Sequence, residues 1–160
     1  SAESLDKMRE VGVIAAVQPA FIYGEADGYS QLLPEDKQEQ FLPLRTFIDA
    51  GVTIAASTDT PCAHYNPFWG LYSAVTRKGM QGYQLGTAEA ISVPEMLRAM
   101  TMGGAALTGE QENKGSLEPG KLADLAVLDR NLNATPDESL RDLEVDLTMV
   151  DGRVVYQKKE

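Results

Sequence analysis

Apolar runs and amphipathic stretches alternate along the first part of the chain. Residues 11–17 and 52–56 are short runs rich in Val, Ile and Ala. Between them lie apolar residues with the spacing of one helix face: Leu44, Phe47 and Ile48. Gly51 follows, where a helix commonly ends in a left-handed residue. The pattern predicts a buried strand, a helix and a second buried strand, the unit that builds parallel sheets.

Three further segments have distinct signals. Residues 21–36 are rich in Gly, Tyr, Ser, Asp and Glu without a clear period, so we expect a long loop there. Asn66, which precedes a proline, predicts the start of a helix. Ser92 and Glu95 have the spacing of a capping box and predict a helix that continues to about Thr108. Its expected buried face consists of Val93, Met96, Leu97, Met100, Gly104 and Leu107.

The C-terminal part has a strand pattern. Residues 125–128, 147–150 and 153–156 are rich in Leu, Val and other apolar residues, and the pair Asp151-Gly152 separates the last two runs. Asp-Gly between two such runs is a strong hairpin signal, so we expect an antiparallel sheet. Residues 115–120 are glycine-containing, but no helix pattern follows them, and we interpret them as a tight turn rather than a phosphate loop.

The composition restricts the classes of partner. The 160 residues carry 14 basic and 24 acidic side chains, a formal net charge of −10, which disfavours nucleic acids and anionic membrane surfaces. No apolar run approaches the length of a membrane span. The single cysteine, Cys62, fits a reducing cytosol, so a cytoplasmic location is favoured, although a cysteine-poor periplasmic protein would look the same.

The main candidate for chemistry is Asp59, which follows the second apolar run through Ser57 and Thr58. In a barrel of parallel strands, side chains just past the carboxyl ends of the strands face the active site, so an aspartate there is a candidate metal ligand or general base. A simple turn is the alternative interpretation, because Asp, Thr and Pro are common turn residues. A full α/β barrel needs about 250 residues, so a chain of this length would hold only part of one.

Four blocks of sequence, at residues 17–19, 49–59, 66–77 and 115–125, occur in an order that resembles the amidohydrolase superfamily. The resemblance is to the branch called amidohydrolase family 3, whose members include N-substituted formamide deformylases and related amide hydrolases. It covers about residues 11–156.

The resemblance implies an α/β fold: the C-terminal part of a metal-dependent hydrolase (β/α)8 barrel plus part of a small β-sandwich domain. Residues 1–112 would hold the last strands and helices of the barrel, and residues 113–160 the C-terminal half of the sandwich. The His-x-His metal motif of the family has no counterpart here, because His64 is the only histidine and lies where the family has no ligand.

The resemblance also implies a reaction. Asp59 matches the aspartate that binds metal and handles the proton in the family, so the parent protein would hydrolyse a small-molecule amide at a C–N bond other than a peptide bond. The cofactor would be a divalent metal, with zinc favoured. Because Asp59 is the only ligand that this chain supplies, we expect the chain alone to bind no metal tightly and to be inactive.

Three other residues have competing interpretations. We interpret His64 as a solvated side chain or hydrogen-bond donor rather than a ligand. Cys62 lies near the expected pocket mouth, but without a recognisable histidine partner we interpret it as a small, semi-buried side chain rather than a nucleophile. Arg77 could hold a carboxylate or a loop, and structural ion pairing is favoured over substrate binding.

Other hypotheses remain open at this point. The chain could be a noncatalytic, amidohydrolase-like structural or binding module. A flavodoxin-like binding domain would fit the strand, helix, strand opening but not the hairpin. Because the two strands would lack their barrel neighbours, we expect the isolated chain to cover their edges by forming a homodimer.

Overall fold

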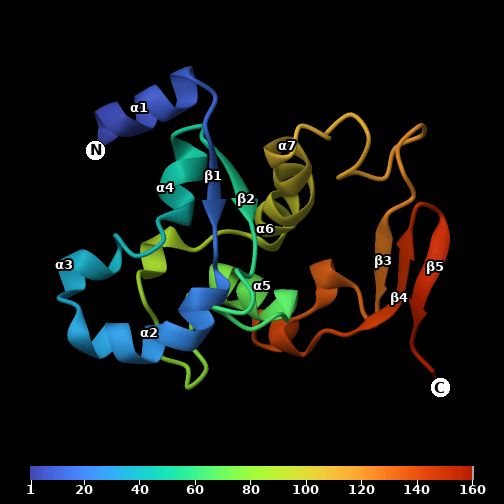
Figure 1. The fold of residues 1–160 in the computed structure, drawn as a ribbon. Helices are drawn as coiled ribbons and strands as arrows, with labels where there is room; N and C mark the ends of the chain where they lie inside the picture. Colours follow the sequence, from blue (N-terminus) through green and yellow to red (C-terminus); the bar gives the residue numbers. More distant parts are fainter. Residues whose placement is uncertain (160) are drawn as a thin grey trace.

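The computed structural model describes residues 1–159 and shows a mixed α/β fold with two separate sheets (Figure 1). The longer elements of the N-terminal part are α1 (Ala2–Glu10), β1 (Ile14–Val17), α2 (Ala20–Leu32), α3 (Glu35–Gln38), α4 (Leu44–Asp49), β2 (Thr53–Ala56) and α5 (Pro67–Thr76). They are followed by η1 (Thr87–Glu89), α6 (Val93–Arg98), η2 (Ala99–Gly103) and α7 (Gly104–Leu107). None of the helices among these residues has the length and apolar character needed to cross a membrane.

The expected strand, helix, strand unit is confirmed. β1 and β2 pair in parallel, with Ile14 opposite Thr53 and Val17 opposite Ala56, and α4 lies between them in the chain. The amide of Ser57 donates to the carbonyl of Val17 at 2.9 Å and extends the pairing by one residue. The two strands therefore end side by side.

The first strand is shorter and less buried than the sequence predicts. Its first expected residues, Val11 and Val13, are 59% and 40% exposed. Their amides donate to carbonyls in the last turn of α1, and Gly12 has a φ of 71°. Residues 11–13 therefore terminate α1, and the backbone is free to pair only from Ile14 onward.

The expectation of a long loop at residues 21–36 is wrong, because most of this segment forms α2 and α3. The buried side chains of α2 have a helical spacing, but Gly, Ser and charged residues between them hide the period: Ala20, Ile22, Tyr23, Ala26 and Asp27. The buried carboxylate of Asp27 accepts the backbone amides of Gln81 (2.9 Å) and Tyr83 (3.3 Å). A polar residue thus belongs to the buried face, which a search for apolar periodicity misses.

Both predicted helix starts are confirmed. The side chain of Asn66 accepts the amide of Phe68 at 2.9 Å, at the start of α5. Ser92 and Glu95 form the predicted capping box at the start of α6. The helix reaches Leu107, but η2 is a π-helix within it. Because a π-helix has more residues per turn, it rotates the buried face, and Leu107 is 49% exposed instead of buried.

Gly103 allows a close backbone approach between η2 and β2. A Cβ at Gly103 would lie 2.2 Å from the carbonyl oxygen of Ile54, whereas a Cβ at Gly104 would meet nothing within 4 Å. Only glycine fits at the first position, and this contact seats η2 directly on β2.

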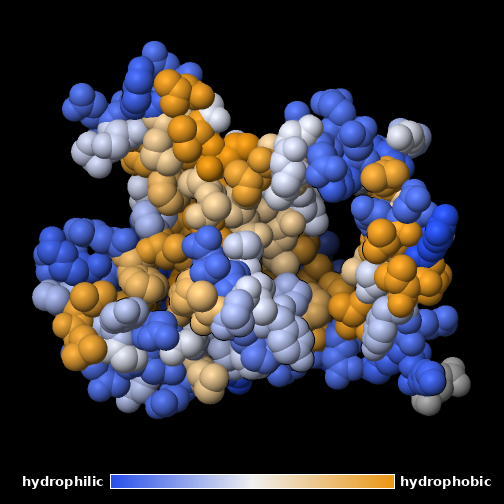
Figure 2. All heavy atoms as spheres, in the orientation of Figure 1, coloured by the Kyte–Doolittle hydropathy of each residue, from blue (hydrophilic) through white to orange (hydrophobic). Residues whose placement is uncertain are grey.

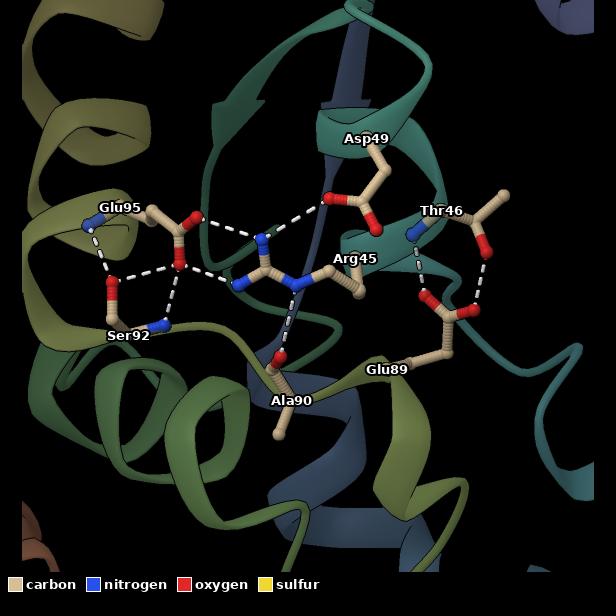
Figure 3. A network of polar contacts seen from close by, with 7 residues as sticks. All are labelled: Arg45, Thr46, Asp49, Glu89, Ala90, Ser92 and Glu95. Carbon is tan, nitrogen blue, oxygen red and sulfur yellow. Dashed lines mark hydrogen bonds and ion pairs between the residues drawn. The ribbon is translucent and has the colours of Figure 1, made fainter.

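A polar network joins α4 to the start of α6 (Figure 3). The guanidinium of Arg45 donates to both carboxylate oxygens of Glu95 at 2.8 and 2.6 Å, and to Asp49 at 3.4 Å. These bonds, with those from Ser92, lower the pKa of Glu95 to about 2. Buried Glu89 accepts the backbone amide of Thr46 at 2.8 Å. The network fixes the helix that leads into β2.

The predicted antiparallel sheet is confirmed and follows the order β3 (Leu125–Leu128), β4 (Val145–Val150) and β5 (Arg153–Gln157). Asp151 and Gly152, both with positive φ, form the turn between β4 and β5. Figure 2 shows hydrophobic side chains on the surface at this sheet. Val127, Val154 and Val155 are 47%, 51% and 61% exposed. The sheet is a single layer with little cover of its own in the described residues.

Candidate active site

The candidate site lies where β1 and β2 end. α2 begins at Ala20, directly after β1, and residues 57–66 leave the end of β2 as a loop that leads into α5 (Figure 1). Because parallel strands end at one edge of a sheet, the start of α2 and this loop meet there. This is the edge at which open and closed parallel sheets bind ligands.

Asp59 is exposed in this loop and adopts a left-handed conformation with a φ of 57°. Its carbonyl accepts the amides of Cys62 at 2.8 Å and Ala63 at 3.3 Å. Residues 59–63 thus form the turn that the sequence left open as an alternative. Within residues 1–159, no hydrogen bond or ion pair involves the Asp59 carboxylate, so both of its oxygens can bind a ligand.

A pocket of about 470 Å³ opens at the turn that follows Asp59, which is not itself among the lining residues. It lies between the first turns of α2 and the loop, and Thr60 and Pro61, the residues after Asp59, are part of its wall. The wall also includes four rings: Tyr23, His64, Tyr65 and Trp69. We call this space the aromatic pocket.

The rings of the aromatic pocket are stacked in a row. The centroids of Tyr65 and His64 lie 4.4 Å apart, those of His64 and Trp69 3.9 Å, and those of Trp69 and Tyr23 4.6 Å. Tyr23 packs edge-on against the buried Tyr72 at 6.0 Å. The row therefore reaches from the exposed loop into the core.

His64 is exposed, as expected, but its hydrogen bond differs from the prediction. Its Nδ1 accepts the amide of Asn66 at 3.1 Å, whereas the sequence interpretation had a solvated side chain or a donor. The backbone amide two residues later fixes this atom as an acceptor. In the neutral ring the proton is then at Nε2. The side chain is placed by stacking and by this bond.

Cys62 is exposed, which corrects the expectation of a semi-buried side chain. Cys62 lies in the turn at residues 59–63, and it lines the aromatic pocket. No histidine is hydrogen-bonded to its thiol among the described residues, so nothing here activates it as a nucleophile.

Arg77 is fully buried and holds loops rather than forming the expected ion pair. Its guanidinium donates to the carbonyls of Leu85 (2.9 Å), Leu42 (3.1 Å) and Phe41 (2.6 Å). Burial lowers its pKa to about 10, while the nearby Glu89 and Glu39 oppose that shift. The interpretation that it holds a loop is confirmed, and its role in the fold is structural.

The chain supplies only part of a metal site. No group of three or more His, Cys, Asp or Glu side chains is close enough to hold a metal among residues 1–159. Asp59 has the donor chemistry for one position, because carboxylate oxygens bind divalent ions and this one has no competing partner. Any further ligands would have to come from outside these residues.

Sequence reasoning missed the aromatic pocket. Tyr65 and Trp69 are six and ten positions past Asp59, and Tyr23 is six positions past the end of β1. Aromatic residues at these distances from two adjacent strand ends are a usable signal. This signal is hidden when residues 21–36, which include Tyr23, are interpreted as a loop.

The fold and this edge define the chain as part of an α/β protein of the amidohydrolase fold. Comparison with protein families gives a match to the amidohydrolase family over residues 1–156, and the chain belongs to that family. It is 33% identical over 153 residues to an N-substituted formamide deformylase of Arthrobacter pascens, an alignment that covers 95% of this chain and 28% of the relative. It is 33% identical over 129 residues to a 5-methylthioadenosine/S-adenosylhomocysteine deaminase of Natronomonas pharaonis, covering 74% of this chain and 29% of the relative.

The structural comparison agrees on the fold. An adenosine deaminase from Xanthomonas campestris with bound zinc superposes with a TM-score of 0.70 and 21% identity, covering 98% of this chain and 35% of that one. The chain thus spans less than a third of the length of the two curated relatives. These two relatives are named as a deformylase and a deaminase.

Proposed function

We propose that the protein to which this chain belongs hydrolyses a C–N bond, other than a peptide bond, of a small amide-type molecule. The observation that supports this most directly is the position of Asp59, an exposed carboxylate without a partner among the described residues, three residues beyond the end of β2. One relative is named N-substituted formamide deformylase, and this name describes a reaction of the same kind.

In this proposal Asp59 moves the proton. Its carboxylate takes a proton from the attacking water and returns it to the nitrogen of the leaving amine, so that water and amide become acid and amine. A divalent ion, with zinc favoured, would supply the acidity that lowers the pKa of water to about 7. Asp59 would provide one of the oxygen ligands of that ion.

The test is Asp59→Asn in the whole protein, assayed with a panel of N-substituted formamides and related amides. General acid–base groups contribute about 10²–10⁴-fold, so we expect kcat to fall by about that factor. Asn has nearly the size of Asp and also tolerates the left-handed backbone, so the turn should persist.

A matched control is available in the hairpin. Asp151→Asn makes the same substitution in another exposed, left-handed residue, with a φ of 48°, in the turn between β4 and β5. It should leave kcat unchanged. If Asp59→Asn retains full activity, the catalytic proposal is wrong, and if the wild-type protein turns over no amide and binds no divalent metal, the noncatalytic alternative is favoured.

We also propose how the chain fits into the whole protein. β1 and β2 would be neighbouring strands of an α/β barrel, with residues 1–112 in the barrel part and 113–160 in half of a β-sandwich. The exposed valines of β3 and β5 support the second part, because a sandwich covers one face of each sheet. An exposed Cys62 supports a reducing compartment such as the cytoplasm.

A further inference from the structure

The aromatic pocket has a wall of stacked rings. Its four rings are held face to face with centroid distances of 3.9–4.6 Å, and Tyr23 at the inner end is only 8% exposed. His64 is fixed further by the bond from Asn66. Rings stacked in this way cannot turn independently, so the wall keeps its shape when a ligand enters.

The lining of the pocket selects against negative charge. No lysine or arginine of the described residues lines it, and Glu25 is a carboxylate on its wall. Phe21, Pro61 and Met80 add further apolar surface. An apolar group without negative charge is therefore the chemistry that this pocket fits.

The position of the pocket relates it to the reaction. Thr60 and Pro61 line it, and they follow Asp59 directly in the chain. A molecule whose C–N bond lay at Asp59 would extend its substituent along this wall. A planar substituent gains most, because a flat ring makes contact over its whole face or edge with stacked rings.

We propose that the aromatic pocket binds a planar, apolar substituent of the substrate without negative charge, such as an aromatic ring on the amide. This proposal rests on the proposed function for the identity of the reacting bond. The binding of the ring itself can be measured without any hydrolysis.

Cys62 provides the measurement, because its thiol is exposed and lines the same pocket. The experiment follows alkylation of Cys62 by iodoacetamide in the whole protein, quantified by mass spectrometry of the peptide that contains Cys62. Acetophenone, which has a planar ring and cannot be hydrolysed, is the probe, and 2-butanone is the control without a ring. We expect acetophenone to slow the alkylation saturably by about threefold or more, as contact with stacked rings predicts, and 2-butanone to have no effect.

Two matched variants locate the binding. Tyr65 is 73% exposed at the outer end of the row, so Tyr65→Ala should leave the fold intact and reduce the protection by acetophenone. Tyr156→Ala also removes an exposed tyrosine ring, but from β5, where Tyr156 is 48% exposed, and it should keep full protection. For each variant, the alkylation rate of Cys62 is measured with and without acetophenone. The ratio of the two rates cancels any change in thiol reactivity.

The outcomes separate the two proposals. Absence of protection in the wild type, equal protection by 2-butanone, or an equal loss in both tyrosine variants would each overturn the pocket proposal. If protection behaves as expected while Asp59→Asn leaves hydrolysis unchanged, the pocket stands and the role of Asp59 is wrong. If Asp59→Asn abolishes hydrolysis without any protection by acetophenone, the reaction stands and the pocket assignment falls.

Discussion

Replacing Arg77 by methionine should destabilise the protein strongly, although the residue is not in the candidate site. Methionine fills a similar volume but donates no hydrogen bond. The Leu42 carbonyl would keep the amide of Leu44 as a donor, whereas the carbonyls of Phe41 and Leu85 would lose their partner. At about 1 kcal/mol for each unsatisfied acceptor, the loss is about 2 kcal/mol. The upper end of the range, about 3 kcal/mol each, is not reached, because the substitution also removes a buried charge whose desolvation is unfavourable.

The measurement for Arg77→Met is the free energy of unfolding from urea titrations followed by circular dichroism. Arg77→Lys keeps the charge but cannot reproduce the planar fork of donors, so it should lose a smaller part of the stability. Arg153→Met removes an exposed arginine from β5 and should change stability by less than about 0.5 kcal/mol. An Arg77→Met protein within about 1 kcal/mol of the wild type would refute the assignment of these three bonds as the reason for the buried arginine.

The other predictions concern packing, pH and assembly. Gly103→Ala should destabilise by about 2 kcal/mol because its Cβ would clash with the Ile54 carbonyl at 2.2 Å, whereas Gly104→Ala, with free space, should be neutral or stabilising; thermal unfolding of both variants checks this. Because the pKa of Glu95 is lowered to about 2 from 4.5 by Arg45, its contribution is present above pH 4.5 and lost as the pH falls toward 2. Both side chains are about 30% exposed, so screening limits the loss to about 1–2 kcal/mol, and Glu95→Gln should flatten the acid limb of urea midpoints; an unchanged limb would contradict this. The isolated 160-residue chain should form a homodimer, and light scattering that shows a cooperatively folding monomer would contradict this.

Local signals explain which elements the sequence predicts well. Asn66, the capping box at Ser92 and the pair Asp151-Gly152 each act within a few residues, and each is in the expected place. The residues that sequence reasoning misjudged depend on distant partners. Asp27 is buried because it binds amides 54 and 56 positions away, and Arg77 because it binds carbonyls 35 and 36 positions away.

The same distinction holds for the candidate site. The position of Asp59 just past a strand follows from the apolar run before it, and the parallel register is the usual result of a strand, helix, strand unit. The row of rings could not be derived in this way, because it joins Tyr23 on α2 to a loop that begins beyond β2. Only the register shows that these two segments leave the sheet at the same level.

That register is the physical link between the fold and the proposed chemistry. Val17 and Ala56 are paired, so the start of α2 and the loop with Asp59 emerge from adjacent strands, about 4.8 Å apart as in any sheet. Gly103 seats η2 on β2, and Arg77 joins residues 41–42 to residue 85. The loop that carries Asp59 and the start of α2 thus share one edge of the sheet, and both contribute rings to the wall of the aromatic pocket. A shift of one residue in the pairing would turn every side chain of β1 to the opposite face and separate the start of α2 from the loop.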